Sequence, residues 1–238
     1  MSAPPSALVF FVAVVGFMIV IGIMAARRDK RRRAALPLEA QQLGLTFEAE
    51  SPATVGRFSE RLRLFQFEGR EPRVANRMYG RREGLDVELF DFGLSIRAAG
   101  KRRWQEQTVV VVAVPGAPLA PFKVDVDVPF GKLVMASRGV TVRDFDFADH
   151  PTFSRRYILA GDDEAAVRRI FTPAVLAWFE AANPLWVECL GDAVAFYRWG
   201  VLVGPGECRA RLDEALGLVR LLVSERDAAA PGRADARG

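Results

Sequence analysis

Two stretches that follow one another along the chain decide the fold: LDVELFDFGLSI at residues 85–96 and WQEQTVVVVAV at residues 104–114. In the first, apolar and acidic residues alternate as far as Leu89, and Phe90 and Phe92 then continue in the opposite phase. A shift of one residue moves every later side chain to the other face of a strand, so we expect a β-bulge at the Leu89–Phe90 step. The second stretch ends in an apolar run without a polar face, which predicts a central strand covered on both sides.

Shorter elements surround this pair of strands. Further strands are expected at residues 45–48, 73–81, 122–128, 154–160, 185–190 and 193–199. Helices are expected at residues 36–43, 162–169, 173–183 and 206–223, with Asp162 and Thr172 as N-caps. Phe145 and Phe147 alternate with acidic residues and belong to a short edge strand or an extended loop. Because short loops rather than crossover helices join the strands, the sequence predicts an α+β fold. A mainly antiparallel sheet packs with helices and closes on a C-terminal amphipathic helix.

The N-terminal region has a different composition. Residues 7–26 are all apolar or small, and a helix of this length spans ~30 Å, the thickness of the hydrocarbon core of a bilayer. No basic residue precedes this run, and the run is longer than the core of a cleaved signal peptide. We therefore expect an uncleaved signal-anchor, that is, one transmembrane helix. The small residues Gly22 and Ala26 have the spacing of a weak helix–helix contact motif.

A basic cluster follows the apolar run. The positive-inside rule then places the N-terminus outside and the later residues in the cytoplasm, at the inner membrane of a bacterium. We expect these residues to contact the anionic inner leaflet, chiefly as a topology determinant rather than as a specific lipid site. The cluster consists of Arg27, Arg28, Lys30, Arg31, Arg32 and Arg33.

The charge argues against a nucleic-acid-binding protein, and the cysteine content argues against a disulfide-bonded one. The chain has a net charge of +4, but residues 27–36 hold six basic residues and one acidic residue, so the remainder has 27 basic and 28 acidic residues. The positive charge is therefore no sign of a nucleic-acid partner. Cys189 and Cys208 lack a CxxC spacing and suit a reducing cytosol, in which they are small buried residues.

These features divide the chain into regions. The expected regions are an N-terminal tail at 1–6, a transmembrane helix at 7–26, a juxtamembrane stem at 27–36, a cytosolic domain at 37–223 with an optional sub-boundary near 148, and a disordered tail at 224–238.

Catalytic and metal signatures are weak. The single histidine, His150, lies beside proline without a nucleophile elbow, and one histidine with two distant cysteines does not form a zinc site. Several aspartates between residues 125 and 149 alternate with apolar residues, which is typical of the wet face of strands. We expect no catalytic, cofactor-binding or metal-binding residues.

Two surfaces are candidates for partners. The helix at 173–183 is apolar nearly all round, so Val175, Trp178 and Phe179 are either buried or form a face for a partner or a second copy. The basic, aromatic stretches 101–104 and 155–157 are either ordinary surface or contacts for phospholipid headgroups.

Three short motifs carry a resemblance to a known group: FSRRY at 153–157, GDDE at 161–164 and FTP at 171–173. They resemble a family of bacterial single-pass inner-membrane proteins with a basic stem and a cytosolic α+β domain. The family has no assigned activity, so the resemblance implies topology and fold only. We expect a non-enzymatic, membrane-tethered module that binds a protein or itself. The alternative is a domain that binds a phospholipid headgroup or a small ligand, and an enzyme ranks third.

Overall fold

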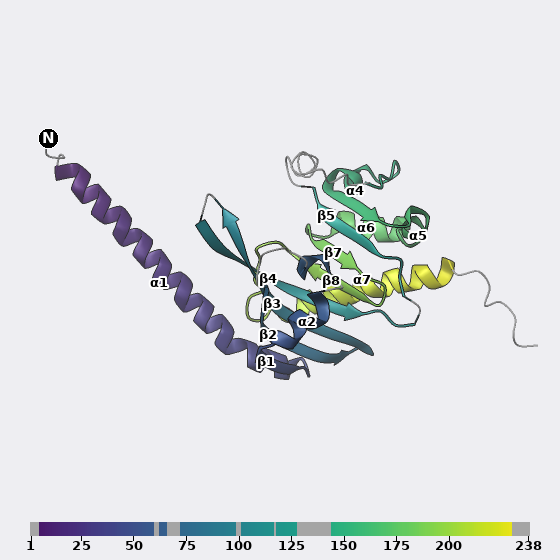
Figure 1. Ribbon diagram of the computed structural model, residues 1–238, viewed down its shortest axis with the longest axis horizontal. Helices are drawn as coiled ribbons and strands as arrows, with labels where there is room; N and C mark the ends of the chain where they lie inside the picture. The colour runs from purple at the N-terminus through teal and green to yellow at the C-terminus, as the bar shows by residue number, and fades with distance from the viewer. Residues whose placement is uncertain are drawn as a thin grey trace, which may run out of the picture.

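A long antiparallel hairpin forms the centre of the sheet in the computed structural model (Figure 1). Strand β3 (Leu85–Ala98) pairs with β4 (Lys101–Ala113) as far as the tip of the hairpin. The four valines at 109–112 are buried although they point alternately to the two faces of the sheet. The prediction of a central strand covered on both sides is therefore confirmed.

The structure describes residues 5–59, 62–65, 72–98, 101–116, 118–127 and 144–229. Within these ranges it describes the backbone but not the side chains of residues 5–9, 11–13, 59, 63, 96–98, 101–103 and 229.

The strands of the described residues form one eight-stranded sheet with the order β1-β2-β3-β4-β8-β7-β5-β6, and every neighbouring pair is antiparallel. The prediction of an α+β fold with an antiparallel sheet is confirmed. Strands β5 and β6 pair across residue 148, so one sheet continues over the optional sub-boundary. The remaining strands are β1 (Thr46–Glu50), β2 (Pro72–Arg82), β5 (Phe122–Val126), β6 (Tyr157–Gly161), β7 (Trp186–Cys189) and β8 (Ala193–Tyr197).

Helices cover both faces of the sheet. One core cluster joins one face to residues of α1, α4, α5, α6 and α7, and a smaller cluster joins the opposite face to α2 and η1. The helices are α1 (Pro5–Gln42), α2 (Pro52–Ser59), the 3-10 turn η1 (Arg63–Phe65), α4 (Pro151–Arg156), α5 (Glu164–Ile170), α6 (Pro173–Ala181) and α7 (Cys208–Ala229).

Helix α1 is a single unbroken helix of 38 residues with Pro37 inside it. The expected stem at 27–36 is part of this helix, and the prediction of a separate short helix at 36–43 is wrong. The N-terminal part of α1 extends away from the sheet, and its end in the domain lies against β1 and β2 (Figure 1). No helix within the described residues combines the length and the apolarity needed to cross a membrane.

The expected bulge lies in the partner strand. In β2, Asn76 and Arg77 together oppose Phe90, and Asn76 has a φ of 51°. Strand β3 changes phase because both of its faces are covered. Leu89 packs in the cluster that contains α1, whereas Phe90 and Phe92 pack against α2 and η1. An apolar residue is therefore favoured on either side of this strand, and no interruption of β3 is needed.

Three local predictions also differ from the structure. Residues 151–156 form α4 with Pro151 in its first turn, and the strand predicted from residue 154 begins only at Tyr157. The cap of α5 is Asp163, whose carboxylate accepts the Ala166 N–H at 2.9 Å, rather than Asp162. Residues 224–229 continue α7 instead of belonging to a disordered tail, and residues 230–238 lie outside the described residues.

Candidate functional site

The C-terminal part of α1 is part of the domain core. Leu36 and Ala40 have no exposed surface, and they lie four residues apart on one face of the helix, as Arg32 and Leu36 also do. This face packs in the same core cluster as Met78 and Leu89 of the sheet. The helix that emerges from the domain is therefore anchored in it by side-chain packing.

Arg32 adds a buried ion pair to this packing. Its residue is 7% exposed, and Nη1 and Nη2 donate to the two carboxylate oxygens of Asp91, each at 2.7 Å. Its Nε donates to the backbone carbonyl of Val203 at 2.7 Å. Burial acts to lower the pKa of Arg32, but the hydrogen bond and the charge of Asp91 raise the pKa above its ordinary value. Such a fork-like pair fixes both position and direction of the helix.

Asp91 is held from the other side by two further groups. The Asn76 side-chain amide donates to Oδ2 at 2.8 Å, and the Thr108 hydroxyl donates to Oδ1 at 2.9 Å. The same hydroxyl accepts the Val203 N–H at 2.9 Å. The network therefore joins α1, β2, β3, β4 and the segment before α7. A buried charge pair is tolerated only when its remaining hydrogen-bonding groups are satisfied in this way.

A second contact of α1 is made by Glu39, which is also buried. Its carboxylate accepts the N–H of Gly206 at 3.1 Å and the N–H of Cys208 at 3.0 Å. These groups lie at the N-terminus of α7, where unpaired N–H groups and the helix dipole favour an anion. Glu39 thus caps a helix that is 169 residues away in the sequence. No local pattern in the sequence marks this cap, because the capping residue comes from another helix.

The two cysteines have no part in this chemistry. Both are free and buried, as predicted. Burial raises the pKa of Cys189 to about 12, and burial together with the nearby charge of Glu39 raises the pKa of Cys208 to about 12. Both thiols therefore remain protonated and are poor nucleophiles at neutral pH.

For one of the six residues predicted to contact the membrane surface, the prediction is wrong. Arg32 cannot reach a lipid headgroup, because its guanidinium is enclosed between α1 and the sheet. Arg33 is exposed, and it forms an ion pair with Asp29 one turn earlier at 3.0 Å. The exposed members of the predicted set are Arg27, Arg28, Lys30, Arg31 and Arg33.

The predicted partner face of α6 is also wrong. Val175 and Phe179 have no exposed surface, and Trp178 is partly buried against the same core cluster. The Phe179 ring lies 5.6 Å from the Phe153 ring and 5.4 Å from the Tyr157 ring, measured between centroids. The apolar character of α6 therefore serves the core of this chain, which is the other reading that the sequence allowed.

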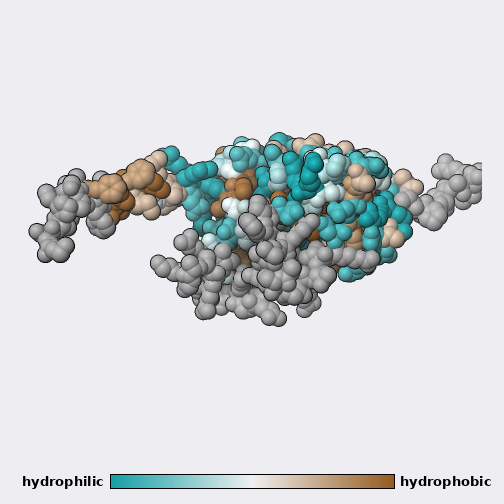
Figure 2. Space-filling model, turned by 90° about the horizontal axis from the view of Figure 1, so that it is seen from above, coloured by the Kyte–Doolittle hydropathy of each residue, from teal (hydrophilic) through white to brown (hydrophobic). Residues whose placement is uncertain are grey.

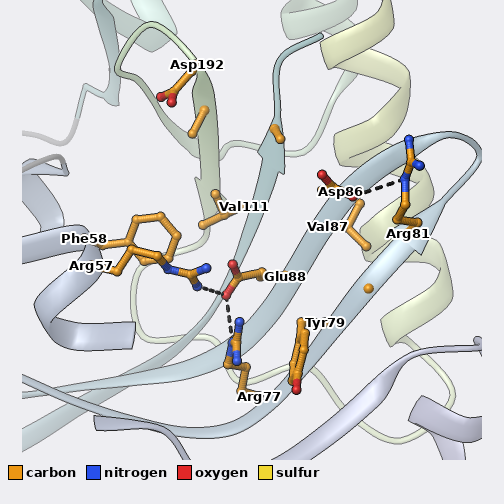
Figure 3. Close-up of a pocket in the computed structure, with 13 residues that line it drawn as sticks. Arg57, Phe58, Arg77, Tyr79, Arg81, Asp86, Val87, Glu88, Val111 and Asp192 are labelled. Carbon is orange, nitrogen blue, oxygen red and sulfur yellow. Dashed lines mark hydrogen bonds and ion pairs between the residues drawn. The ribbon is translucent and has the colours of Figure 1, made fainter. Parts of the chain in front are cut away.

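An open pocket of about 490 Å³ lies on the face of the sheet that α2 covers (Figure 3). Arg57 of α2 and Arg77 of β2 both point to Glu88 of β3, with Arg77 Nε at 2.8 Å. Arg77 also pairs with Glu48 at 2.9 Å. Burial acts to lower the pKa of Arg77, but its hydrogen bonds to these two carboxylates raise that pKa overall. The two arginines and the two glutamates thus balance in charge, so the pocket favours no strongly charged ligand.

His150 and its neighbours hold α4 in place. His150 Nδ1 lies 3.4 Å from Oε2 of Glu180. The other carboxylate oxygen of Glu180, Oε1, accepts the Phe153 N–H at 3.1 Å. The hydroxyl of Ser154 accepts the Phe147 N–H at 2.9 Å and does not serve His150. In the part of the chain that the structure describes, no three His, Cys, Asp or Glu side chains are grouped to hold a metal ion.

The two basic stretches differ in their surroundings. Arg156 donates to the backbone carbonyls of Glu180 and Ala182, each at 3.0 Å, and so completes the end of α6. Trp104, in contrast, is 59% exposed. The side chains of residues 101–103 lie outside those described.

Comparison with known proteins gives little further guidance. No family model matches the chain, and no curated protein matches it. Among solved structures, the crystal structure of the mycobacterial trehalose monomycolate transport factor A, TtfA, is similar, with 18% sequence identity and a TM-score of 0.49. The alignment covers 85% of this chain and 96% of that chain. A likeness at this score carries no conclusion about the present protein, and the resemblance to inner-membrane proteins stays a prediction.

Proposed function

We propose that the protein is a single-pass membrane protein whose α+β domain is held in a fixed position at the bilayer surface and binds a protein partner or a second copy there. One observation carries the proposal: the apolar run at 7–26 and the docked segment at 32–42 belong to the same unbroken helix. A domain attached in this way is a rigid extension of its anchor.

The exposure of apolar side chains supports a bilayer as the environment of the N-terminal part of α1. Large apolar residues there have exposed fractions from 39% at Val15 to 72% at Phe10. Figure 2 shows this hydrophobic surface on the protruding helix, beside a domain surface that is largely hydrophilic in the same view. Apolar surface left in water is unfavourable by ~25 cal/mol per Å², and lipid removes that penalty. The residues are Phe10, Val14, Val15, Phe17, Met18, Ile19, Val20, Ile21, Ile23 and Met24.

The orientation follows from the basic residues that are exposed. Five of them lie on the domain side of the apolar run. The positive-inside rule then puts the domain in the cytoplasm and the N-terminus outside, at the inner membrane of a bacterium. From Ala26 to Arg32 the helix rises by ~9 Å. The part of β3 that Arg32 contacts therefore lies close to the headgroups.

A non-enzymatic binding role fits the uses of the polar side chains. The buried charges Arg32, Asp91 and Glu39 are occupied in joining α1 to the sheet and to α7. His150 and Ser154 are occupied in holding α4. A rigid, near-neutral domain at the membrane surface is suited to presenting a surface to a partner.

The anchor is tested by placing charge in the apolar run of the full-length chain. Ile19→Arg with Val20→Arg adds about 5–7 kcal/mol to the free energy of membrane insertion, so the variant should leave the carbonate-resistant membrane pellet. Leu38→Arg is the matched control, because Leu38 is an exposed apolar residue on the same helix outside the run. A double variant that stays in the pellet would contradict the anchor.

The orientation is tested by cysteine labelling in intact cells. The buried native thiols are unreactive, so Ser2→Cys and Ser224→Cys can each be labelled alone with a membrane-impermeant maleimide. We expect labelling at position 2 from outside and at position 224 only after lysis. The reverse pattern would contradict the proposed topology.

The binding role is tested by crosslinking in native membranes. Self-association should give a product at twice the 26.3 kDa mass of the chain, and a protein partner should give a specific heavier product. Each should be lost when purified, untagged protein is added in excess. A chain that yields only monomer over all exposed lysine and engineered cysteine positions would contradict a binding role.

A second candidate function is the binding of a small polar ligand in the pocket beside α2. Its volume of about 490 Å³ lies in the range of small-molecule sites. Because the charges of Arg57 and Arg77 are balanced by those of Glu88 and Glu48, a neutral or zwitterionic ligand is favoured. Native mass spectrometry of the full chain should show an additional mass that Ala113→Phe, which narrows the pocket, removes. Equal masses for both proteins would argue against this function.

A further inference from the structure

The β3–β4 hairpin extends beyond the rest of the sheet. Strand β2 pairs with β3 only as far as Leu94, and β8 pairs with β4 only from Val109. Residues 95–98 and 101–104 therefore pair with each other and, among the described strands, with no third one. Figure 1 shows that this extension and the free part of α1 run to the same side of the domain.

The distance that the hairpin extends beyond the Arg32–Asp91 pair can be compared with the same distance along α1. Arg32 and Asp91 are bonded to each other, and Thr108 is the sheet partner of Asp91, so the three mark a common level. From Thr108 to Trp104 the strand advances by ~13 Å at ~3.3 Å per residue. Along α1 the same distance from Arg32 reaches roughly Ile23, at ~1.5 Å per residue. Trp104 therefore lies level with the domain-side end of the apolar run.

Trp104 itself has the features of an interfacial residue. It is 59% exposed although it is large and mostly apolar. Its ring lies over Gly93, where an added Cβ would be 3.5 Å from the ring, so the indole is on the same face of the hairpin as Asp91 and α1. Tryptophan is enriched at the boundary between headgroups and acyl chains, because its ring is apolar and its N–H is polar.

The sequence around the tip is basic. Lys101, Arg102 and Arg103 directly precede Trp104 in β4, and Arg97 is paired in register with Arg102. Basic residues at this level are attracted to an anionic leaflet.

We propose that the part of the β3–β4 hairpin that extends beyond the sheet, residues 95–98 and 101–104, is a second membrane contact, which places Trp104 at the interface and binds anionic phospholipid headgroups through its basic sequence. The inference rests on the proposed membrane anchor. It adds a function to the hairpin, because two contacts, α1 and the hairpin, fix the tilt of the domain as well as its distance from the bilayer.

The test uses the full chain in nanodiscs that contain phosphatidylglycerol and brominated phosphatidylcholine, which quenches tryptophans at the interface. We expect quenching of the native protein and loss of most of it in Trp104→Phe. Trp199→Phe is the matched control, because Trp199 is also exposed but lies nearer the level of Asp91. Equal quenching of the native protein and of Trp104→Phe would overturn the proposal.

The role of the charges is tested separately. The triple variant Lys101→Gln, Arg102→Gln and Arg103→Gln should lose the extra quenching that phosphatidylglycerol gives over pure phosphatidylcholine. An unchanged dependence on phosphatidylglycerol would overturn the headgroup assignment. Failure of the proposed anchor is a different result, because the chain would then not enter nanodiscs at all. A hairpin whose Trp104 is not quenched and which crosslinks to a protein would contact a protein partner instead of lipid.

Discussion

The two parts of helix α1 invert the usual rule of burial. Phe10 and the described large apolar side chains from Val14 to Met24 are exposed, whereas two charged residues between Arg32 and Gln42 are buried. The core clusters of the described residues include none of the side chains in the first part, and the proposed bilayer would cover them. In the second, Arg32 and Glu39 have specific partners in the sheet and at α7. The end of the apolar run is therefore not the boundary of the domain.

The comparison teaches that a basic flank can have two functions within one turn of helix. Arg31 and Arg33 point to solvent and suit the membrane surface, while Arg32 between them points to the sheet. Neighbouring residues on a helix lie about 100° apart, so a run of like charges does not share one environment. The domain begins where the helix first meets the sheet, inside the basic run.

The largest effect is expected from Asp91→Ala. The substitution leaves the Arg32 charge buried without a partner, which should reduce the free energy of unfolding by about 3–5 kcal/mol. Urea unfolding in detergent micelles, followed by near-ultraviolet circular dichroism, measures it, and membrane attachment should be unchanged. Asp86→Ala is the control, since Asp86 is exposed and pairs with Arg81 at the surface. Similar losses in the free energy of unfolding for the two variants would contradict the claim that the buried ion pair matters more for stability than the exposed one.

A somewhat smaller effect is expected from Leu36→Ala. Leu36 is fully buried between α1 and the sheet, so the cavity should destabilise the domain by about 2–4 kcal/mol. Leu38→Ala on the exposed side of the same helix should change the stability by less than ~0.5 kcal/mol. The same unfolding experiment compares them. If both variants behave alike, the docked part of α1 is not core.

Glu39→Gln is expected to have a moderate effect. The ionised carboxylate accepts two N–H groups at the start of α7, and an amide offers only one oxygen, so a loss of about 1–2 kcal/mol is expected. Hydrogen exchange should speed up in the first turn of α7 before it does elsewhere. Glu50→Gln on the exposed edge strand serves as the control, and a slow, unchanged first turn of α7 in Glu39→Gln would rule out this cap.

The smallest effect is expected from Arg33→Ala. The Arg33–Asp29 pair is exposed and spans one helical turn, so its loss should change the stability by no more than ~0.5 kcal/mol. That change should disappear in concentrated salt, which screens exposed pairs. A loss in Arg33→Ala as large as that in Asp91→Ala would mean that the two neighbouring arginines do not differ in environment.

Local patterns in the sequence predict much of the fold. Alternation along residues 85–96 and the apolar run at 109–114 predict the central strands, and Thr172 with Pro173 predicts the start of α6, because these signals come from neighbouring residues. The turn at Gly191–Asp192 likewise defines the β7–β8 hairpin. These elements are antiparallel neighbours, so their pairing follows from short loops.

The site could not be predicted in the same way, because its partners are distant in the sequence. Arg32 and Asp91 are 59 residues apart, and within a basic run Arg32 has no local mark. The available signal was Asp91 itself, the single charged residue between Leu89 and Ile96, where apolar side chains occupy both faces of the strand. Phe179 shows the converse limit, since an apolar helix has the same pattern whether it packs in its own core or against a partner.

The most direct test of the account is a distance measurement across the junction. Spin labels at Arg28→Cys and Arg209→Cys, both exposed positions, report on the rigidity of the link between α1 and the domain in nanodiscs, while the buried native thiols stay unlabelled. We predict one narrow distance distribution, which broadens when Arg31, Arg33 and Ala34 are replaced by glycine. A native chain as broad in its distances as the glycine variant would contradict a rigid helix that joins the membrane to the sheet.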